Sequence, residues 1–255
     1  MKNQPKAENQ WSLTPLICDP IDLIEYKNKT FDSLFDRGDK LLLENIRFDE
    51  CMFVNSAISL TKDISRRSVV RNVDLKNCAA NGCDVGSAIL ENVNIDGLAT
   101  NDLLIIWGAT FNHVKLSGNI GKLKINPYAH HVGRTEATQG PFDAHRIALY
   151  NSIDWALDIS EARFKEFDVR GIPAKLFRRD PETQIIVSRE RALRAGWRES
   201  ISSTNTLWPF MIDLFLSDGV EDTVLVAPLG APKKKRDELI SGLRELRDLG
   251  VAEPD

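Results

Sequence analysis

A period of five residues is the feature of this sequence that most restricts its fold. Between Leu41 and Ala174, every fifth residue tends to be apolar, and so does the residue two positions before it. The run without a phase error comprises the pairs Ser68/Val70, Val73/Leu75, Cys78/Ala80, Cys83/Val85, Ala88/Leu90, Val93/Ile95, Leu98/Thr100 and Leu103/Ile105. Helices repeat about every 3.6 residues and strands about every 2, so neither sustains this period. A fixed short period is typical of a solenoid, whose units bury their apolar faces by stacking.

Breaks in the period predict two insertions. Residues 60–67 are rich in charge and predict a short loop, whereas residues 126–154 contain prolines, glycines and a short helix expected at 142–150. The period returns at Leu157/Ile159 and ends at Ile172/Ala174. Smaller slips near 107–108 and 118–121 predict bulges or corner glycines. We therefore expect one repeat domain at 41–175, interrupted at 60–67 and 126–154 and preceded by a polar lead-in or cap at 1–40.

The last part of the chain, 176–255, follows a different pattern and predicts an α+β appendage. Strands are expected at 184–187 and 223–227. Helices are expected at 188–199, with Ser188 as the N-cap, at 207–216 and at 233–249. Trp197 and Trp208 are expected to anchor this appendage to the repeat domain. The predicted fold class is mainly β, a solenoid with a C-terminal α+β appendage.

Several repeat units resemble those of the pentapeptide-repeat proteins. The segment Phe48-Asp-Glu-Cys51-Met-Phe53 and the unit Val93-Asn94-Ile95 are similar to that family's pattern of a small residue, Asp or Asn, and a central Leu or Phe. Other units depart from it, since Ala, Arg, Ile or Leu often replaces the Asp or Asn. The resemblance implies a right-handed quadrilateral β-helix with four units per coil and five or six coils. It also implies binding functions, including protection of a topoisomerase by imitation of DNA.

Charge and composition exclude several functions. The net charge is −4, and nine acidic and nine basic residues balance one another between Glu44 and Ile125. A nucleic-acid groove needs excess positive charge, and a DNA mimic needs heavy negative charge, so neither is expected. No glycine-rich phosphate loop precedes a helix. The apolar stretches are too short to cross a bilayer, and the first residues lack a signal-peptide core, so the cytoplasm is the predicted location.

Candidate metal ligands and nucleophiles are sparse. Cys51, Cys78 and Cys83 occupy equivalent repeat positions and predict buried free thiols rather than a disulfide framework or a metal site. The adjacent histidines of the second insertion could belong to an acid/base or metal site, or to a solvated loop. No serine or cysteine has the setting of an activated nucleophile. We therefore predict no metal, no cofactor and no enzymatic activity.

The predicted function is binding of a protein partner through the insertions, because irregular loops on a rigid scaffold carry specificity. The candidate partner-binding residues are Arg66, Arg67, Tyr128, His130, His131 and Arg134. By analogy of fold, the leading hypothesis is a bacterial immunity or inhibitor-type protein. The alternatives are a topoisomerase-protecting protein and an enzyme with a site where the second insertion meets the appendage. Pairing with a second copy is left open.

Overall fold

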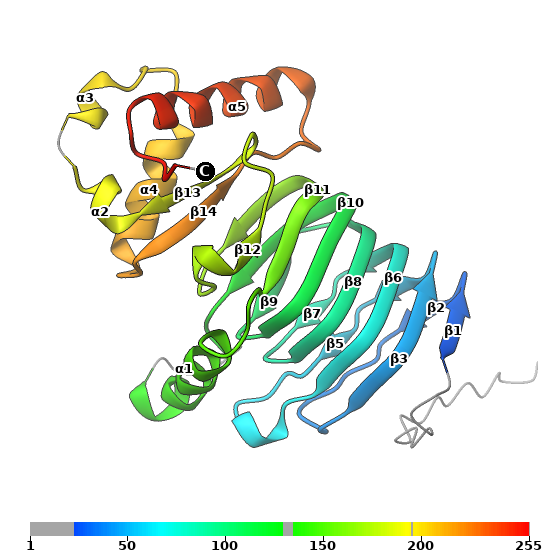
Figure 1. Ribbon diagram of the computed structural model, residues 1–255. Coiled ribbons are helices and arrows are strands. Elements are labelled where there is room, and N and C mark those ends of the chain that lie inside the picture. Colours follow the sequence, from blue (N-terminus) through cyan, green and yellow to red (C-terminus); the bar gives the residue numbers. More distant parts are fainter. Residues whose placement is uncertain (1–22, 130–134, 195, 255) are drawn as a thin grey trace, which may run out of the picture.

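The protein is mainly β, and its largest element is a curled parallel sheet (Figure 1). The computed structural model describes residues 23–129, 135–194 and 196–254. Within them, twelve strands form the sheet. These are β1 (Ile24–Lys27), β2 (Thr30–Asp32), β3 (Leu42–Asp49), β4 (Met52–Val54), β5 (Ala57–Ile58), β6 (Val69–Asn81), β7 (Asp84–Val85), β8 (Ile89–Thr100), β9 (Leu104–Trp107), β10 (Thr110–Asn126), β11 (Leu157–Val169) and β12 (Phe177–Arg178).

Residues that pair in adjacent strands of the sheet are about 20 positions apart in the sequence. Val73 of β6 pairs with Val93 of β8, and Leu157 of β11 pairs with Phe177 of β12, each 20 residues further along the chain. The offset is 27 residues from Ile46 to Val73, across the first insertion. It is 43 residues from Val114 to Leu157, across the second. Each insertion therefore lengthens the connection between two adjacent strands, and the strand after it still pairs in parallel with the strand before it.

The paired positions also explain the period of apolar residues. Ile46, Val73, Val93, Val114 and Leu157 lie one above another in successive strands and are all buried. At the N-terminal end of the stack, rings of successive layers stack: Tyr26 on Phe48 at 5.5 Å, and Phe31 on Phe53 at 5.3 Å. The parallel sheet begins at Ile24, earlier than the expected start at Leu41, because β1 pairs with β3.

Bends in the sheet occur where the backbone adopts positive φ, again about every fifth residue. The positions with this spacing are Asn28, Ser33 and Gly38; Asn45, Glu50 and Asn55; Asn72, Asn77 and Gly82; Asn92 and Gly97; and Gly108, His113 and Gly118, whereas Lys40, Ser59 and Gly171 have positive φ outside it. Asparagine and glycine tolerate this conformation best. The Asn72 amide donates to Asn45 Oδ1 at 3.1 Å and accepts from Asn92 at 3.2 Å. Side-chain amides thus join successive layers at one bend.

The appendage lies at the end of the stack opposite β1 (Figure 1). Its strands β13 (Gln184–Ser188) and β14 (Asp222–Val226) pair antiparallel, near the positions expected from the sequence. Val224 and Val226 pack into the core of the large sheet, whereas Leu225 packs into a second core. The hairpin therefore covers the end of the sheet with one face and supports the helices of the appendage with the other.

The appendage helices are α2 (Arg189–Ala192), α3 (Trp197–Ser200), α4 (Leu207–Ser217) and α5 (Lys233–Asp248). The last two lie close to their predicted ranges. The prediction of one helix over 188–199 is wrong, because the chain forms two short helices and Gly196 has a φ of 96° between them. Trp197 and Trp208 belong to the second core, so they stabilise the appendage itself.

Candidate functional site

The two insertions contact each other on one side of the sheet. The first, 60–67, contains a 3-10 turn (Ile64–Arg66), and the second contains helix α1 (Glu136–Tyr150), which starts before its predicted position. Arg67 Nη2 lies 3.1 Å from Nδ1 and 3.0 Å from Nε2 of His145 in α1. We call this contact between residues 60–67 and α1 the seam; both segments lie at the same border of the layers in Figure 1.

Hydrogen bonds fasten the first insertion to the bends of the sheet. Asp63 accepts from the backbone N–H of Ser65 at 2.9 Å, which caps the 3-10 turn. Arg66 Nε donates to the carbonyl of Gly38 at 2.8 Å. These bonds hold the loop in one position beside the sheet.

Helix α1 is fastened to the end of β10. The buried Gln139 accepts from the backbone N–H of Ala129 at 3.1 Å, and Arg146 Nη1 donates to the carbonyl of Pro127 at 2.9 Å. Phe142 and Tyr150 are buried beneath the helix. Both sides of the seam are therefore anchored, and the seam is a fixed feature of the surface.

Arg67 is buried without an acidic partner. Its exposed fraction is 6%, and Nε and Nη1 have no hydrogen-bond partner in the described chain. Burial lowers the pKa of Arg67 to about 10, so the guanidinium remains charged at neutral pH. Burial and the Arg67 charge together lower the pKa of His145, which favours a neutral imidazole that can accept from Nη2.

A second buried charge, Asp36, shows how this fold satisfies such groups elsewhere. Its carboxylate accepts from the backbone N–H groups of Gly38, Asp39 and Ser59 at 2.8–3.0 Å, and from Ser68 Oγ at 2.6 Å. Ser68 directly follows Arg67. The fully bonded carboxylate of Asp36 is therefore hydrogen-bonded to the residue next to Arg67, whose guanidinium is incompletely bonded.

The structure places the six predicted partner-binding residues differently. Arg66 is exposed and Arg67 is buried at the seam, whereas Tyr128 is half-buried at the end of β10, where its backbone N–H donates to Asn126. His130, His131 and Arg134 lie outside the described residues. His145 was not among the predicted binding residues. The five-residue period gives no signal for His145, because the two insertions are related only by their contact in the folded structure.

Charges on the outer side of the sheet alternate from strand to strand. Glu25, Arg47 and Asp74 are neighbours in register, and Arg47 pairs with both acids, at 2.8 Å and 3.5 Å. Arg71 likewise lies between Glu44 and Glu91, at 3.4 Å and 2.6 Å. Further cross-strand pairs are Lys27–Asp49, Lys115–Glu161, Lys122–Glu166 and Lys124–Asp168. This pattern differs from the continuous acidic face that imitates DNA.

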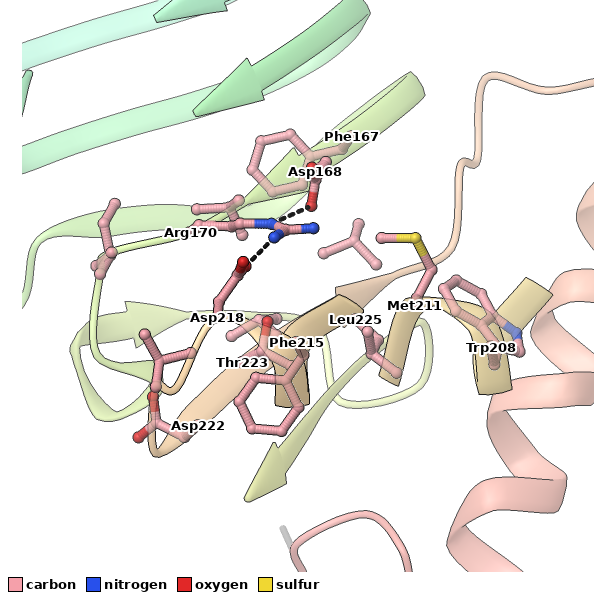
Figure 2. Close-up of a pocket in the computed structure, with 16 residues that line it drawn as sticks. Phe167, Asp168, Arg170, Trp208, Met211, Phe215, Asp218, Asp222, Thr223 and Leu225 are labelled. Atoms are coloured by element: carbon pink, nitrogen blue, oxygen red, sulfur yellow. Dashed lines mark hydrogen bonds and ion pairs between the residues drawn. The ribbon is translucent and has the colours of Figure 1, made fainter. Parts of the chain in front are cut away.

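A small pocket lies between the large sheet and the appendage, as Figure 2 shows. Its volume of about 30 Å³ has room for about one water molecule. Arg170 forms ion pairs with Asp168 and with Asp218 of the appendage. Since its charged groups are paired and its space is small, this pocket favours attachment of the appendage over binding of a substrate.

The other candidate chemical groups are structural in character. The His113 ring donates one hydrogen bond to the exposed Asp154 carboxylate at 2.6 Å, and its centroid lies 4.6 Å from that of the Trp155 ring. Cys51, Cys78 and Cys83 are free; the first two are buried and Cys83 is half-buried. Cys18 lies outside the described residues. Within the described ranges, no group of three or more His, Cys, Asp or Glu could hold a metal ion.

No helix in the described part of the chain is both long enough and apolar enough to cross a membrane. Comparisons with protein-family models, with curated proteins and with solved structures find no match to this chain.

Proposed function

We propose that this chain is a non-enzymatic scaffold that binds a protein partner at the seam. One observation carries the proposal: insertions 78 residues apart, measured from Arg67 to His145, converge on one surface. Irregular segments on a regular scaffold are where binding specificity is usually placed. The seam also holds Arg67, whose guanidinium is incompletely bonded within the described chain, whereas the surrounding faces carry paired charges.

We also propose that the curled sheet is a right-handed β-helix of pentapeptide-like repeats. Two observations support this. The 20-residue register equals four units of five, and positive φ recurs at about every fifth residue, as a bend between short strands would require. Right-handed connections between parallel strands are strongly preferred. A scaffold of this kind would hold both insertions at fixed positions.

An immunity or inhibitor-type role in the cytoplasm of a bacterium is the form of this function that we favour. Such a protein acts by occupying a partner's surface, which requires a rigid recognition site and neither a cofactor nor a metal. The anchored seam fits that requirement.

The alternatives have less support. Topoisomerase protection through DNA mimicry calls for a continuous negative stripe, but acids and bases alternate along the strands. An enzyme with a site at the second insertion would gain support from a histidine beside a buried carboxylate. His145 faces a guanidinium instead.

Affinity capture from the cell that makes this protein tests the proposal. The baits are the natural chain, the double variant Arg67→Met/His145→Gln and the control Lys115→Gln, each checked for folding by circular dichroism. We expect one dominant protein bound by the natural chain and the control and lost by the double variant. A toxin encoded by a neighbouring gene would support the immunity role. Equal capture by all three baits, or no specific capture, would contradict binding at the seam.

A further inference from the structure

Arg67 has hydrogen-bonding capacity that the described chain leaves unused. A guanidinium carries five N–H donors, and here Nε and Nη1 are buried with no acceptor, while Nη2 faces His145. Burying such donors without partners is costly, and most buried polar groups in native proteins are bonded. Nε and Nη1 are therefore the donors with which Arg67 could bind an acceptor.

An acceptor suited to Arg67 should carry negative charge. The pKa of Arg67 remains about 10, so a positive charge persists in a position that is nearly closed to solvent. His145 is held neutral by burial and by Arg67, and a neutral ring cannot balance that charge. The nearby buried acid, Asp36, is occupied by four donors from Gly38, Asp39, Ser59 and Ser68.

The charge at the seam favours a monovalent acceptor. A carboxylate carries one negative charge and matches one guanidinium, with which it forms strong charge-assisted hydrogen bonds. A phosphate group carries about −1.5 to −2 at neutral pH and would leave uncompensated negative charge beside a neutral histidine. A single carboxylate is therefore the better match in charge.

We propose that Arg67 is a receptor for one carboxylate, supplied by an acidic side chain of the protein partner. The source of the carboxylate rests on the proposed function; the receptor itself rests on the geometry of Arg67 and can be tested without the partner. In this account Arg67 determines specificity for an acidic residue at the centre of the partner's contact surface, and the neutral His145 imidazole orients the guanidinium.

Binding of small carboxylates to the purified full chain tests the receptor. The probes are N-acetyl-glutamate amide, its glutamine counterpart as an uncharged control, and sodium acetate compared with sodium chloride at equal ionic strength. We expect the glutamate probe to raise Tm saturably by about 2–4 °C, since ligands that bind only the folded state stabilise it. The glutamine probe should have no effect, and acetate should exceed chloride.

Substitutions test whether the carboxylate probes bind at Arg67. Arg67→Met should abolish binding, and Arg67→Lys, which keeps the charge but loses the planar set of donors, should weaken it about tenfold or more. Arg37→Gln, which removes an exposed arginine, is the matched control and should bind as the natural chain does. Calorimetry gives the affinities directly.

The outcomes separate this inference from the proposed function. Binding of acetate without the glutamate probe would overturn the side-chain source and favour a free carboxylate. Equal effects of glutamate and glutamine probes, or unchanged binding in Arg67→Met, would overturn the receptor. If the receptor binds as expected but capture finds no partner at the seam, the proposed function fails while the receptor stands.

Discussion

Charged side chains are paired on the outer faces of the sheet, whereas the charged side chain at the seam is incompletely bonded. On the faces, parallel strands in register bring each basic side chain against acids of the adjacent layers, as Arg71 lies against Glu44 and Glu91. At the seam, Arg67 is more deeply buried, and the described residues include no acid paired with it. We propose that this difference reflects two roles, with charges on the faces arranged for stability and Arg67 at the seam kept for a partner.

The interior of the stack should show the largest effect on stability. Leu157 is completely buried in β11, so Leu157→Ala removes apolar contacts and leaves a cavity. We expect the free energy of unfolding to fall by about 2–5 kcal/mol. Leu103→Ala, at a leucine that is 40% exposed, should change it by about 0.5 kcal/mol or less. Urea unfolding measures both; similar losses would mean that the layers do not pack as described.

A bend of the sheet should show a smaller effect. Asn72 has a φ of 52° and joins the amides of two other layers, so Asn72→Ala loses both the hydrogen bonds and a residue suited to that conformation. We expect a loss of about 1–2 kcal/mol. Asn72→Gly keeps the conformation and should lose less. Equal losses in the two variants would show that the positive φ contributes nothing.

Reversal of one charge on a face should have an effect that depends on salt. Arg71→Glu places a third acid between Glu44 and Glu91, and we expect it to cost about 1 kcal/mol at low ionic strength. Salt should reduce that cost, because these side chains are partly exposed. Arg37→Glu, away from the charge ladder, is the control. A cost unaffected by salt would point to lost packing instead of charge.

The smallest effect should be the dependence of stability on pH that arises from His145 at the seam. The pKa of His145 is lowered in the folded state from its ordinary 6.5, so below about pH 6.5 the unfolded chain binds a proton that the folded chain resists. Stability should therefore fall as the pH drops from 7.5 to 5.5. Arg67→Met removes the second cause of the lowered His145 pKa, so the stability of this variant should decline less steeply as the pH falls. Parallel declines in the two proteins would exclude coupling between Arg67 and His145.

Much of the architecture could be predicted because it is local or periodic. The apolar stripe of α5 and the short apolar runs of β13 and β14 depend on neighbouring residues, and their predicted positions agree with the structure to within a few residues. The five-residue spacing predicted the buried columns that include Val73 and Val93. The spacing of asparagines and glycines at the bends was equally visible in the sequence and was missed.

The seam could be predicted only in part. Arg67 was selected because it lies in a break of the period, which is a local signal. Its contact with His145 depends on where two insertions of different length fold back against the sheet, and no period relates them. The burial of Arg67 and its missing acceptor arise from that contact, so only the structure reveals them.

If Arg67 serves binding while its counterparts on the faces serve stability, replacing the two kinds of arginine should change stability in opposite directions. Arg67→Met and Arg71→Met each exchange one arginine for methionine, and urea unfolding at pH 7.5 without ligand compares them directly. We expect Arg67→Met to raise the free energy of unfolding by about 1 kcal/mol, because an incompletely bonded buried charge is removed, and Arg71→Met to lower it by about 0.5–1 kcal/mol. A loss of stability in Arg67→Met equal to or greater than that in Arg71→Met would contradict this division of roles.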